Sequence, residues 1–383
     1  MRHNKQNILH VLSIYYQLHY FIGDQFLYFK GKGAHEHVIC SNHENLKSYA
    51  KKMGFEYSST PIQRHISLKT DLKSLIHISR YIRKNNIGIV VGHSPKGGLL
   101  AMLAAFICNV PTRIYFRHGL VYETATGFLR KLLIACDKIT SLCATKIVCV
   151  SNSVLRQSIK DKLGSVNKQI VLGKGTCTGI DTRGKFNPEN INPHKLSNLK
   201  SKWGIEDGDF VLGYSGRMAK DKGIPQVVQA FEMAKKKYPK LKLLLMGPFD
   251  SRDILPNAIK DKILNYKDII WTDFIDEDQE YFYAMMNVYI LASYREGFPI
   301  GILEAQSMGV PGITTKVTGC IDSIISEKTG LFIEDIDKNN IFEAICYYID
   351  NNLNKQYSKN ARKWVSDNFD QSIVWKHIEQ LYS

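Results

Sequence analysis

The chain has 383 residues, of which 44% are apolar and 23% charged, a composition that excludes a disordered protein. Its length exceeds what one hydrophobic core usually organises, so two domains are expected. The net charge of +15 is uneven, because residues 1–180 hold 25 Lys and Arg against 8 Asp and Glu, whereas the remainder holds 26 against 28. The cationic half predicts an anionic partner (nucleic acid, a membrane surface or a phosphorylated acceptor), although a basic surface kept for solubility has the same pattern.

Short apolar runs alternate with helical patterns along the first half of the chain. Helical stretches such as residues 68–85 and 96–108 separate the expected strands. Those strands are residues 8–14, 37–41, 87–91, 113–116 and 146–150. Strands that alternate with helices of this length indicate βαβ units and a parallel sheet.

The alternation begins again after a loop-like tract at residues 173–193. A helix is expected at residues 224–237, among strands at 210–214, 241–246, 268–270 and 288–291. The sequence therefore predicts an α/β protein of two Rossmann-like parallel-sheet domains with a ligand cleft between them. The expected domains are residues 1–180 and 181–368, followed by a terminal helix, 369–383, that packs back towards the first domain.

The cysteines and apolar runs bear on where the protein works. The eight cysteines form no Cys-x-x-Cys pair and most lie in apolar segments, which predicts reduced, buried thiols in a cytosolic protein. No secretory signal is visible, and the longest apolar run, residues 99–108, is too short to span a bilayer. We therefore expect a cytoplasmic protein, and the charge of the cationic half predicts that it lies peripherally on the cytoplasmic face of the membrane.

The most specific motif is Glu296-Gly-Phe-Pro-Ile-Gly-Ile-Leu-Glu304. A strand and a loop precede it and a helix follows, so Glu296 belongs to the loop and Glu304 to the first turns of the helix. Gly297, Pro299 and Gly301 allow backbone N–H groups to approach a ligand, and a helix N-terminus attracts phosphate. The two carboxylates could accept hydrogen bonds from sugar hydroxyls on either side of that phosphate. Two isolated glutamates would mean little, but the intervening Gly-Phe-Pro makes the pattern specific.

A second motif, Gly213-Tyr-Ser-Gly-Arg-Met-Ala-Lys-Asp-Lys-Gly223, lies between an expected strand and an expected helix. Arg217 can donate two parallel hydrogen bonds to phosphate oxygens, and Lys222 adds a positive charge beside the phosphate. Such cations stabilise the negative charge that develops on a departing diphosphate. A basic solvated turn is the alternative, and the strand before and helix after the motif favour phosphate binding.

Together the two motifs resemble glycosyltransferase family 4, whose members are retaining enzymes with the two-domain GT-B fold, and the resemblance covers most of the chain. The segment Gly173-Lys-Gly-Thr-Cys-Thr-Gly-Ile-Asp181 is similar to the family's interdomain segment, with Thr178 in place of the usual Asn. Gly92-His-Ser-Pro-Lys-Gly-Gly98 and Arg117-His-Gly119 resemble a subgroup that builds bacterial capsule, O-antigen and glycoprotein glycans on lipid diphosphates.

The resemblance implies a retaining hexosyl- or N-acetylhexosaminyltransferase. Its donor would be a nucleotide diphosphate sugar, with UDP favoured, and its acceptor a glycan or a glycan linked to a lipid diphosphate. Arg217 and Lys222 would hold the diphosphate, Glu296 the sugar hydroxyls and Glu304 the ribose. His118, from the amino-terminal domain, would approach the donor sugar, so His118, Glu296, Arg217 and Lys222 are the expected catalytic residues. Further donor contacts would come from Gly216, Gly297, Phe298, Pro299 and Ile300.

The sequence contains fewer signals for the residues that would bind the acceptor. His93 and Lys96 are candidates there, although a turn and helix start explain His-Ser-Pro-Lys equally well. The first loop, residues 13–23, lacks the Gly-Gly pair that many family members carry near the diphosphate. The resemblance implies that no metal and no cofactor are needed, and Arg217 and Lys222 could replace a metal electrostatically. The Asp-x-Asp sequences at 207–209 and 335–337 resemble turns.

Three rival interpretations remain. A nucleotide-sugar epimerase of the same fold is one, and the spacing of Glu296 and Glu304 argues against it. A catalytically silent partner subunit of a transferase complex is another, and the intact motif argues against that. A nucleic-acid-binding protein is suggested by charge alone. No recognition helix, zinc finger or RNA-binding aromatic motif is present, so no nucleic-acid partner is expected.

Overall fold

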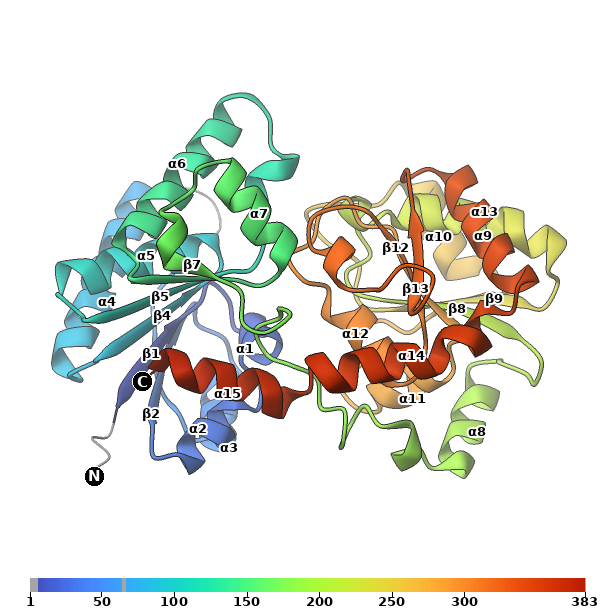
Figure 1. Ribbon diagram of the computed structural model, residues 1–383, viewed down its shortest axis with the longest axis horizontal. Helices are drawn as coiled ribbons and strands as arrows, with labels where there is room; N and C mark the ends of the chain where they lie inside the picture. Colours follow the sequence, from blue (N-terminus) through green and yellow to red (C-terminus); the bar gives the residue numbers. More distant parts are fainter. Residues whose placement is uncertain (1–5, 64–66, 383) are drawn as a thin grey trace. The chain divides into compact units, whose positions relative to one another are not determined.

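The computed structural model describes residues 6–63 and 67–382 and consists of two compact units (Figure 1). Unit 1 comprises the chain up to Gly179 together with the last helix from Ser372, and unit 2 comprises Ile180–Gln371. Each unit has its own parallel sheet. The predicted α/β fold with two Rossmann-like parallel-sheet domains is therefore confirmed.

The described part of unit 1 contains a parallel sheet of seven strands in the order β3-β2-β1-β4-β5-β6-β7. The chain winds outward from β1 in one direction and from β4 in the other. Loops that follow these two neighbouring strands therefore diverge, and such a switch point is where open α/β sheets bind ligands. The strands are β1 (Asn7–Val11), β2 (His35–Cys40), β3 (Glu56–Ser59), β4 (Ile89–His93), β5 (Thr112–Arg117), β6 (Lys146–Cys149) and β7 (Gln169–Ile170).

Helices cover both faces of this sheet because the strands are apolar on both faces. Strand residues such as Val11 and Val90 pack in a core with α4 and α5, whereas Val38 and Cys40 pack with α1, α2 and α3. The helices of unit 1 are α1 (Tyr16–Phe21), α2 (Gln25–Gly31), α3 (Leu46–Met53), α4 (Leu68–Lys84), α5 (Pro95–Ile107), α6 (Gly127–Cys143), α7 (Asn152–Lys160) and α15 (Gln371–Tyr382), with 3₁₀ turns at Val121–Thr124 and Val166–Lys168.

Two glycines of the Gly92–Gly98 motif have a steric role in unit 1. A Cβ on Gly98 would lie 2.6 Å from the ring of Tyr115, and one on Gly92 would lie 2.9 Å from the Cα of Gly98. Helix α5 can therefore approach β4 and β5 closely only where side chains are missing. Helix α15 packs within the same unit, where Trp375 Nε1 donates to the carbonyl of Thr178 over 2.7 Å.

The described part of unit 2 contains a parallel sheet of six strands in the order β10-β9-β8-β11-β12-β13. Its switch point lies between β8 and β11. The strands are β8 (Phe210–Ser215), β9 (Leu241–Met246), β10 (Ile269–Trp271), β11 (Val288–Leu291), β12 (Gly312–Thr315) and β13 (Gly330–Ile333). The helices are α8 (Pro193–Lys202), α9 (Ile224–Lys237), α10 (Asn257–Asn265), α11 (Gln279–Ala284), α12 (Ile300–Ser307), α13 (Lys338–Asp350) and α14 (Leu353–Asn368), with 3₁₀ turns at Pro188–Asn190, Lys220–Lys222 and Cys320–Asp322.

The predicted strands all exist, but the first is shorter than expected. The apolar run at residues 8–14 forms a strand only to Val11, because the chain then turns into α1. Strands β3, β7, β12 and β13 were not predicted. All eight cysteines are free thiols, and five of them are buried. Within the described residues, no helix combines the length and apolar character needed to cross a membrane.

Candidate active site

The two motifs of unit 2 meet at its switch point. Arg217 and Lys222 lie on the segment that follows β8, and Glu296 lies on the loop between β11 and α12. Gly223 brings the two segments together, since its φ is +68° and a Cβ there would lie 2.1 Å from the carbonyl oxygen of Ala292. A side chain at position 223 would force the two segments apart, so glycine is required.

Each cation of this site is held by carboxylates. Lys222 Nζ lies 2.5 Å from Glu296 Oε1, and both side chains are only 15% exposed. Arg217 donates through Nη1 to Asp250 and through Nη2 to Asp221, the latter over 3.2 Å. The guanidinium is thereby fixed in orientation while part of it stays accessible to a ligand.

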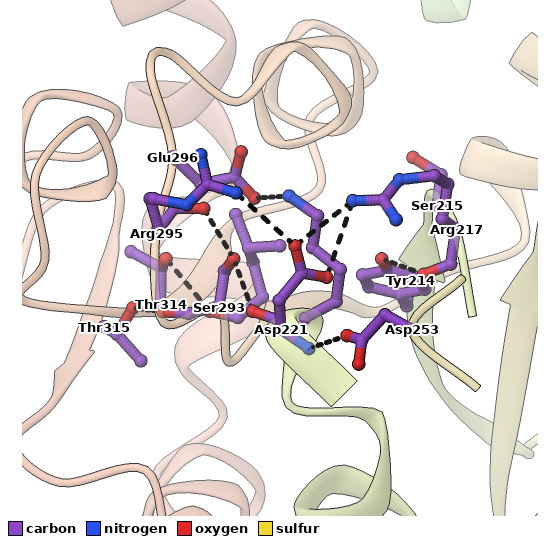
Figure 2. A network of polar contacts seen from close by, with 12 residues as sticks. Tyr214, Ser215, Arg217, Asp221, Asp253, Ser293, Arg295, Glu296, Thr314 and Thr315 are labelled. Carbon is purple, nitrogen blue, oxygen red and sulfur yellow. Dashed lines mark hydrogen bonds and ion pairs between the residues drawn. The ribbon is translucent and has the colours of Figure 1, made fainter. Parts of the chain in front are cut away.

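Asp221 links the two loops of the site. Figure 2 shows its carboxylate between the guanidinium groups of Arg217 and Arg295, which lies 3.9 Å away. Its carbonyl accepts hydrogen bonds from the backbone N–H of Tyr294 and the hydroxyl of Ser293. The segment after β8 and the loop after β11 are therefore joined by both main-chain and side-chain bonds.

Asp250 orients Arg217 from a third loop, which follows β9. Burial alone would raise the pKa of this carboxyl. Hydrogen bonds from the backbone N–H groups of Asp253 and Arg252 and from Arg217 outweigh burial and lower the pKa below its ordinary value. Asp250 therefore stays ionised and keeps Arg217 in place.

Glu304 lies within α12 and is held by Tyr283, whose hydroxyl donates to Oε2 over 2.6 Å. Burial raises the pKa of Glu304 above its ordinary value, although the bond from Tyr283 opposes this. Gly301 lets the start of α12 approach β8, because a Cβ there would lie 2.4 Å from Ser215 Oγ. The first N–H groups of a helix have no partner inside it, so this end of α12 attracts anions. Phe298, Pro299 and Ile300 form the entry to this helix.

In unit 1, His118 follows β5 and is half-buried. Its ring stacks on Phe21 of α1 with centroids 3.6 Å apart, and its Nε2 lies 3.0 Å from His93 Nδ1. The preceding Arg117 is fully buried, and its guanidinium lies 2.5 Å from Asp137. Phe21 lies in the segment 13–23 that was expected to be a loop, but Tyr16–Phe21 of that segment form α1, which supplies an aromatic partner to His118. Arg117 anchors the strand end from which His118 projects.

The two acceptor-side candidates have different surroundings. His93, at the end of β4, is buried and contacts His118. Lys96, in the first turn of α5, forms an ion pair with Asp71 of α4 and is mostly covered. Ser94 between them adopts φ +63° and ψ 158°, a strained conformation for a non-glycine residue, and strain of this kind gathers at functional sites.

Several residues of the site were not found by sequence reasoning. Asp221 stands inside the Gly213–Gly223 motif, but an aspartate between two lysines resembles a solvated turn. Asp250 follows the correctly predicted strand at residues 241–246, and this position was a signal that could have found it. Side chains that follow parallel strands lie together at one edge of the sheet. Tyr283 carried no signal, since it lies in a short helix distant in sequence from Glu304.

Comparisons with known proteins cover both units. The family described as Glycosyl transferases group 1 matches residues 197–364, and the family Glycosyl transferase 4-like matches residues 9–151. The capsular polysaccharide biosynthesis glycosyltransferase CapM of Staphylococcus aureus is 33% identical over 379 residues, which cover 99% of this chain and 97% of its own. UDP-Gal:alpha-D-GlcNAc-diphosphoundecaprenol alpha-1,3-galactosyltransferase of Escherichia coli is 27% identical over 90% of this chain and 88% of its own.

Solved structures show the same fold. A glycosyltransferase from Rickettsia africae ESF-5 has a TM-score of 0.79 at 22% identity, covering 99% of this chain and 98% of its own. Anabaena Alr3699/HepE, solved in complex with UDP-glucose, has a TM-score of 0.78 at 17% identity, covering 98% of this chain and 99% of its own. With both halves matched and a relative at 33% identity along nearly the whole length, the chain belongs to glycosyltransferase family 4 and has the GT-B fold.

Proposed function

We propose that this glycosyltransferase moves a hexose or N-acetylhexosamine from a UDP sugar to a glycan on a lipid diphosphate, with retention of anomeric configuration, in bacterial surface polysaccharide synthesis. The observation that carries the proposal is the Lys222–Glu296 pair beside the oriented Arg217. Cations suited to a diphosphate and a carboxylate suited to sugar hydroxyls stand together at the switch point of unit 2. A site that bound only phosphate would not need the carboxylate, and a site that bound only a sugar would not need the cations.

The cations have the geometry that a departing diphosphate requires. Asp221 and Asp250 fix the plane of the Arg217 guanidinium, so little rotamer freedom is lost when phosphate oxygens bind its remaining donors. Lys222 can share its three hydrogens between Glu296 and a phosphate oxygen. As the bond between the anomeric carbon and the phosphate oxygen breaks, both cations stabilise the new charge.

The carboxylates account for the two ends of the donor. Glu296 would accept hydrogen bonds from hydroxyls of the transferred sugar. Glu304 uses Oε2 for Tyr283, which leaves Oε1 for the ribose hydroxyls. No second carboxylate is assigned as a nucleophile, so we propose attack on the face that the diphosphate leaves. The acceptor oxygen bonds to the anomeric carbon, and its proton passes to the departing phosphate oxygen.

The relatives support the finer parts of this proposal. The Escherichia coli relative is named for galactosyl transfer from UDP-Gal to a GlcNAc-diphosphoundecaprenol. A Campylobacter jejuni relative, 23% identical, is an N-acetylgalactosaminyltransferase named for a diphospho-undecaprenol acceptor. CapM is named for capsular polysaccharide biosynthesis. A UDP donor and a lipid diphosphate acceptor are thus the first pair to test.

A donor screen tests this function. The full chain is incubated with UDP-Glc, UDP-Gal, UDP-GlcNAc, UDP-GalNAc or GDP-Man, with and without an undecaprenyl diphosphate-linked sugar, and nucleotide release is measured. We expect one UDP sugar to be consumed faster when acceptor is present, and NMR of the product to show the donor's anomeric configuration. An inverted product would refute retention. Use of GDP-Man alone would refute the UDP donor, and release of free sugar at an unchanged rate with acceptor would refute transfer to the lipid.

We further propose that unit 1 binds the anionic membrane surface where such an acceptor lies. The first turn of α6 exposes Phe128 at 80%, next to the exposed Leu129, Arg130 and Lys131. An amphipathic helix that served only the core would bury these apolar side chains. Each basic residue near an anionic surface contributes about 1 kcal/mol, which salt screens.

Vesicle flotation tests the membrane proposal. We expect binding to vesicles containing phosphatidylglycerol at low salt, weaker binding at high salt, and little binding to neutral phosphatidylcholine. Replacing Phe128 and Leu129 with Ser should weaken binding, whereas Ser at the exposed Ile254 of unit 2 is the matched control. Equal binding to both vesicle types, or none, would refute a membrane role for the basic surface.

A further inference from the structure

A continuous line of polar side chains crosses the core of unit 1 and ends at His118. Glu36 Oε2 lies 3.1 Å from His10 Nε2, and His10 Nδ1 lies 3.1 Å from His93 Nε2. His93 Nδ1 lies 3.0 Å from His118 Nε2. His10 and His93 thus each direct Nε2 back along the line toward Glu36 and Nδ1 forward toward His118.

The register of the sheet explains how the line forms. The neighbouring strands β2, β1 and β4 contribute Glu36, His10 and His93, and His118 follows β5. Glu36 is paired with Ile8, and His10 with Val91, so each contact joins a residue to one two places further along the next strand. Residues two apart share a face of the sheet, so the line runs diagonally over one face, crosses the switch point between β1 and β4 and ends at the carboxyl end of β5.

The line is closed to water except at its end. Glu36, His10 and His93 are 5%, 3% and 2% exposed, whereas His118 is half-buried. Phe26 packs edge-on against His10, and Phe21 stacks on His118. The charge of Glu36 also acts on two titratable side chains outside the line, since burial and this charge raise the pKa of Tyr382, and the charge opposes the lowering of the pKa of His37 by burial. In the described residues no three His, Cys, Asp or Glu side chains converge as metal ligands, so the arrangement is a line and not a metal cage.

Burying Glu36 in this core costs free energy. Its Oε1 is buried and has no hydrogen-bond partner in the described part of the chain, so His10 is its one polar contact. A buried carboxylate with an unsatisfied oxygen costs free energy that an apolar residue would not cost. The stability of the fold therefore does not explain why a glutamate occupies position 36, whereas an effect of its carboxylate on the hydrogen bonds of the histidines does.

The carboxylate can set the direction of all three hydrogen bonds. An ionised carboxylate only accepts, so His10 must donate to it through Nε2. With one hydrogen per neutral ring, His10 Nδ1 then accepts from His93 Nε2, and His93 Nδ1 accepts from His118 Nε2. Burial lowers the pKa of His93 well below its ordinary value and that of His118 to about 3, so both rings remain neutral.

We propose that Glu36, His10 and His93 are positioning residues that hold His118 in the Nε2–H tautomer and leave its Nδ1 as a hydrogen-bond acceptor for a hydroxyl of the transferred sugar. That recognition of the sugar rests on the proposed function, whereas the tautomer does not. A hydroxyl that donates to Nδ1 is held without a charged ring in the site. With hydrogens on both nitrogens of His10, the bond to Glu36 would keep its direction, but the two bonds between histidines would reverse and His118 Nδ1 would become a donor.

Nitrogen NMR of the full chain measures the tautomer directly. With ¹⁵N-labelled histidine, two-bond ¹H–¹⁵N correlation spectra at pH 7.5 distinguish protonated from unprotonated ring nitrogens, and the spectrum of His118→Asn identifies the His118 signals. We expect a hydrogen on Nε2 of His118 and none on Nδ1. In Glu36→Gln the amide can either accept or donate, so direction is no longer enforced and the Nδ1–H form of His118 should appear.

Glu56→Gln is the matched control, because Glu56 lies on the adjacent β3, is exposed and contacts His37, which is outside the line. It should leave the His118 signals unchanged. Wild-type His118 with hydrogen on Nδ1, or with both nitrogens protonated, would overturn the proposal. So would a Glu36→Gln spectrum identical to the wild type. The wild-type spectrum tests the direction even if Glu36→Gln does not fold.

Donor turnover separates this inference from the proposed function. With the UDP sugar found by the screen, Glu36→Gln should lower kcat about tenfold, equivalent to about 1.4 kcal/mol, while Glu56→Gln keeps the wild-type value. Unchanged kcat in Glu36→Gln together with an altered tautomer would overturn the sugar-binding role. Absence of any transfer by the wild type would refute the proposed function and leave the tautomer result standing.

Discussion

Replacing Glu296 with Gln separates the two roles that the structure suggests for this residue. The carboxylate pairs with Lys222 at 2.5 Å, and both side chains are 15% exposed. Gln keeps the shape and one acceptor oxygen, so the variant loses the charge but retains a hydrogen bond. A charged hydrogen bond contributes about 2 kcal/mol, and a neutral one about half as much. The expected loss of stability is therefore about 1 kcal/mol.

That loss is small on the scale of unfolding. For a unit of this size, 1 kcal/mol lowers the unfolding midpoint by about 2–4 °C. The effect on transfer should be much larger, because a neutral amide replaces the carboxylate proposed to bind the sugar as charge develops. Losing 1.5–3 kcal/mol of such binding in the transition state lowers kcat/KM by about 10- to 100-fold.

The measurement pairs thermal unfolding by circular dichroism with UDP release in the presence of acceptor. The control is Glu334→Gln, which removes an exposed partner of Lys316 in the same unit. An exposed pair contributes about 0–1 kcal/mol, so this control should keep wild-type transfer and nearly the wild-type midpoint. Wild-type turnover by Glu296→Gln would refute its contact with the sugar. An unfolding midpoint identical to that of Glu334→Gln would refute the energetic importance of the Lys222 pair.

Three further predictions follow from the same site. Arg217→Ala and Lys222→Ala should each lower kcat by about 10²–10³-fold, and normal kinetics in both would place the diphosphate elsewhere. Transfer in excess EDTA should equal transfer with Mg²⁺, and a complete, reversible loss would contradict charge stabilisation by these side chains alone. Because the pKa of Asp250 is lowered in the folded chain, its stabilisation is present above the ordinary carboxyl pKa of about 3.9 and declines as pH falls further. Asp250→Asn should therefore lower the unfolding midpoint more at pH 7 than at pH 3, and an equal loss at both would contradict this assignment.

Local patterns in the sequence were enough to predict the fold and the cationic half of the candidate site. Apolar runs separated by helical patterns predicted the parallel sheets, since that alternation is a property of neighbouring residues. The strand before Arg217 and the helix after Lys222 placed both residues at a strand's carboxyl end. Strands β3 and β7 were missed because β3 is largely exposed and β7 has two residues, so neither makes an apolar run.

Contacts between residues distant in the chain were decided only by the tertiary structure. Glu36, His10, His93 and His118 are spread over more than a hundred positions, and none of their local sequences indicates a partner. Sheet order and register bring them within hydrogen-bonding distance, because neighbouring parallel strands need not be neighbours in sequence. The sequence by itself determined the family and the types of side chain at each strand end. The pairing of Lys222 with Glu296, and the line from Glu36 through His10 and His93 to His118, depended on packing that no single segment encodes.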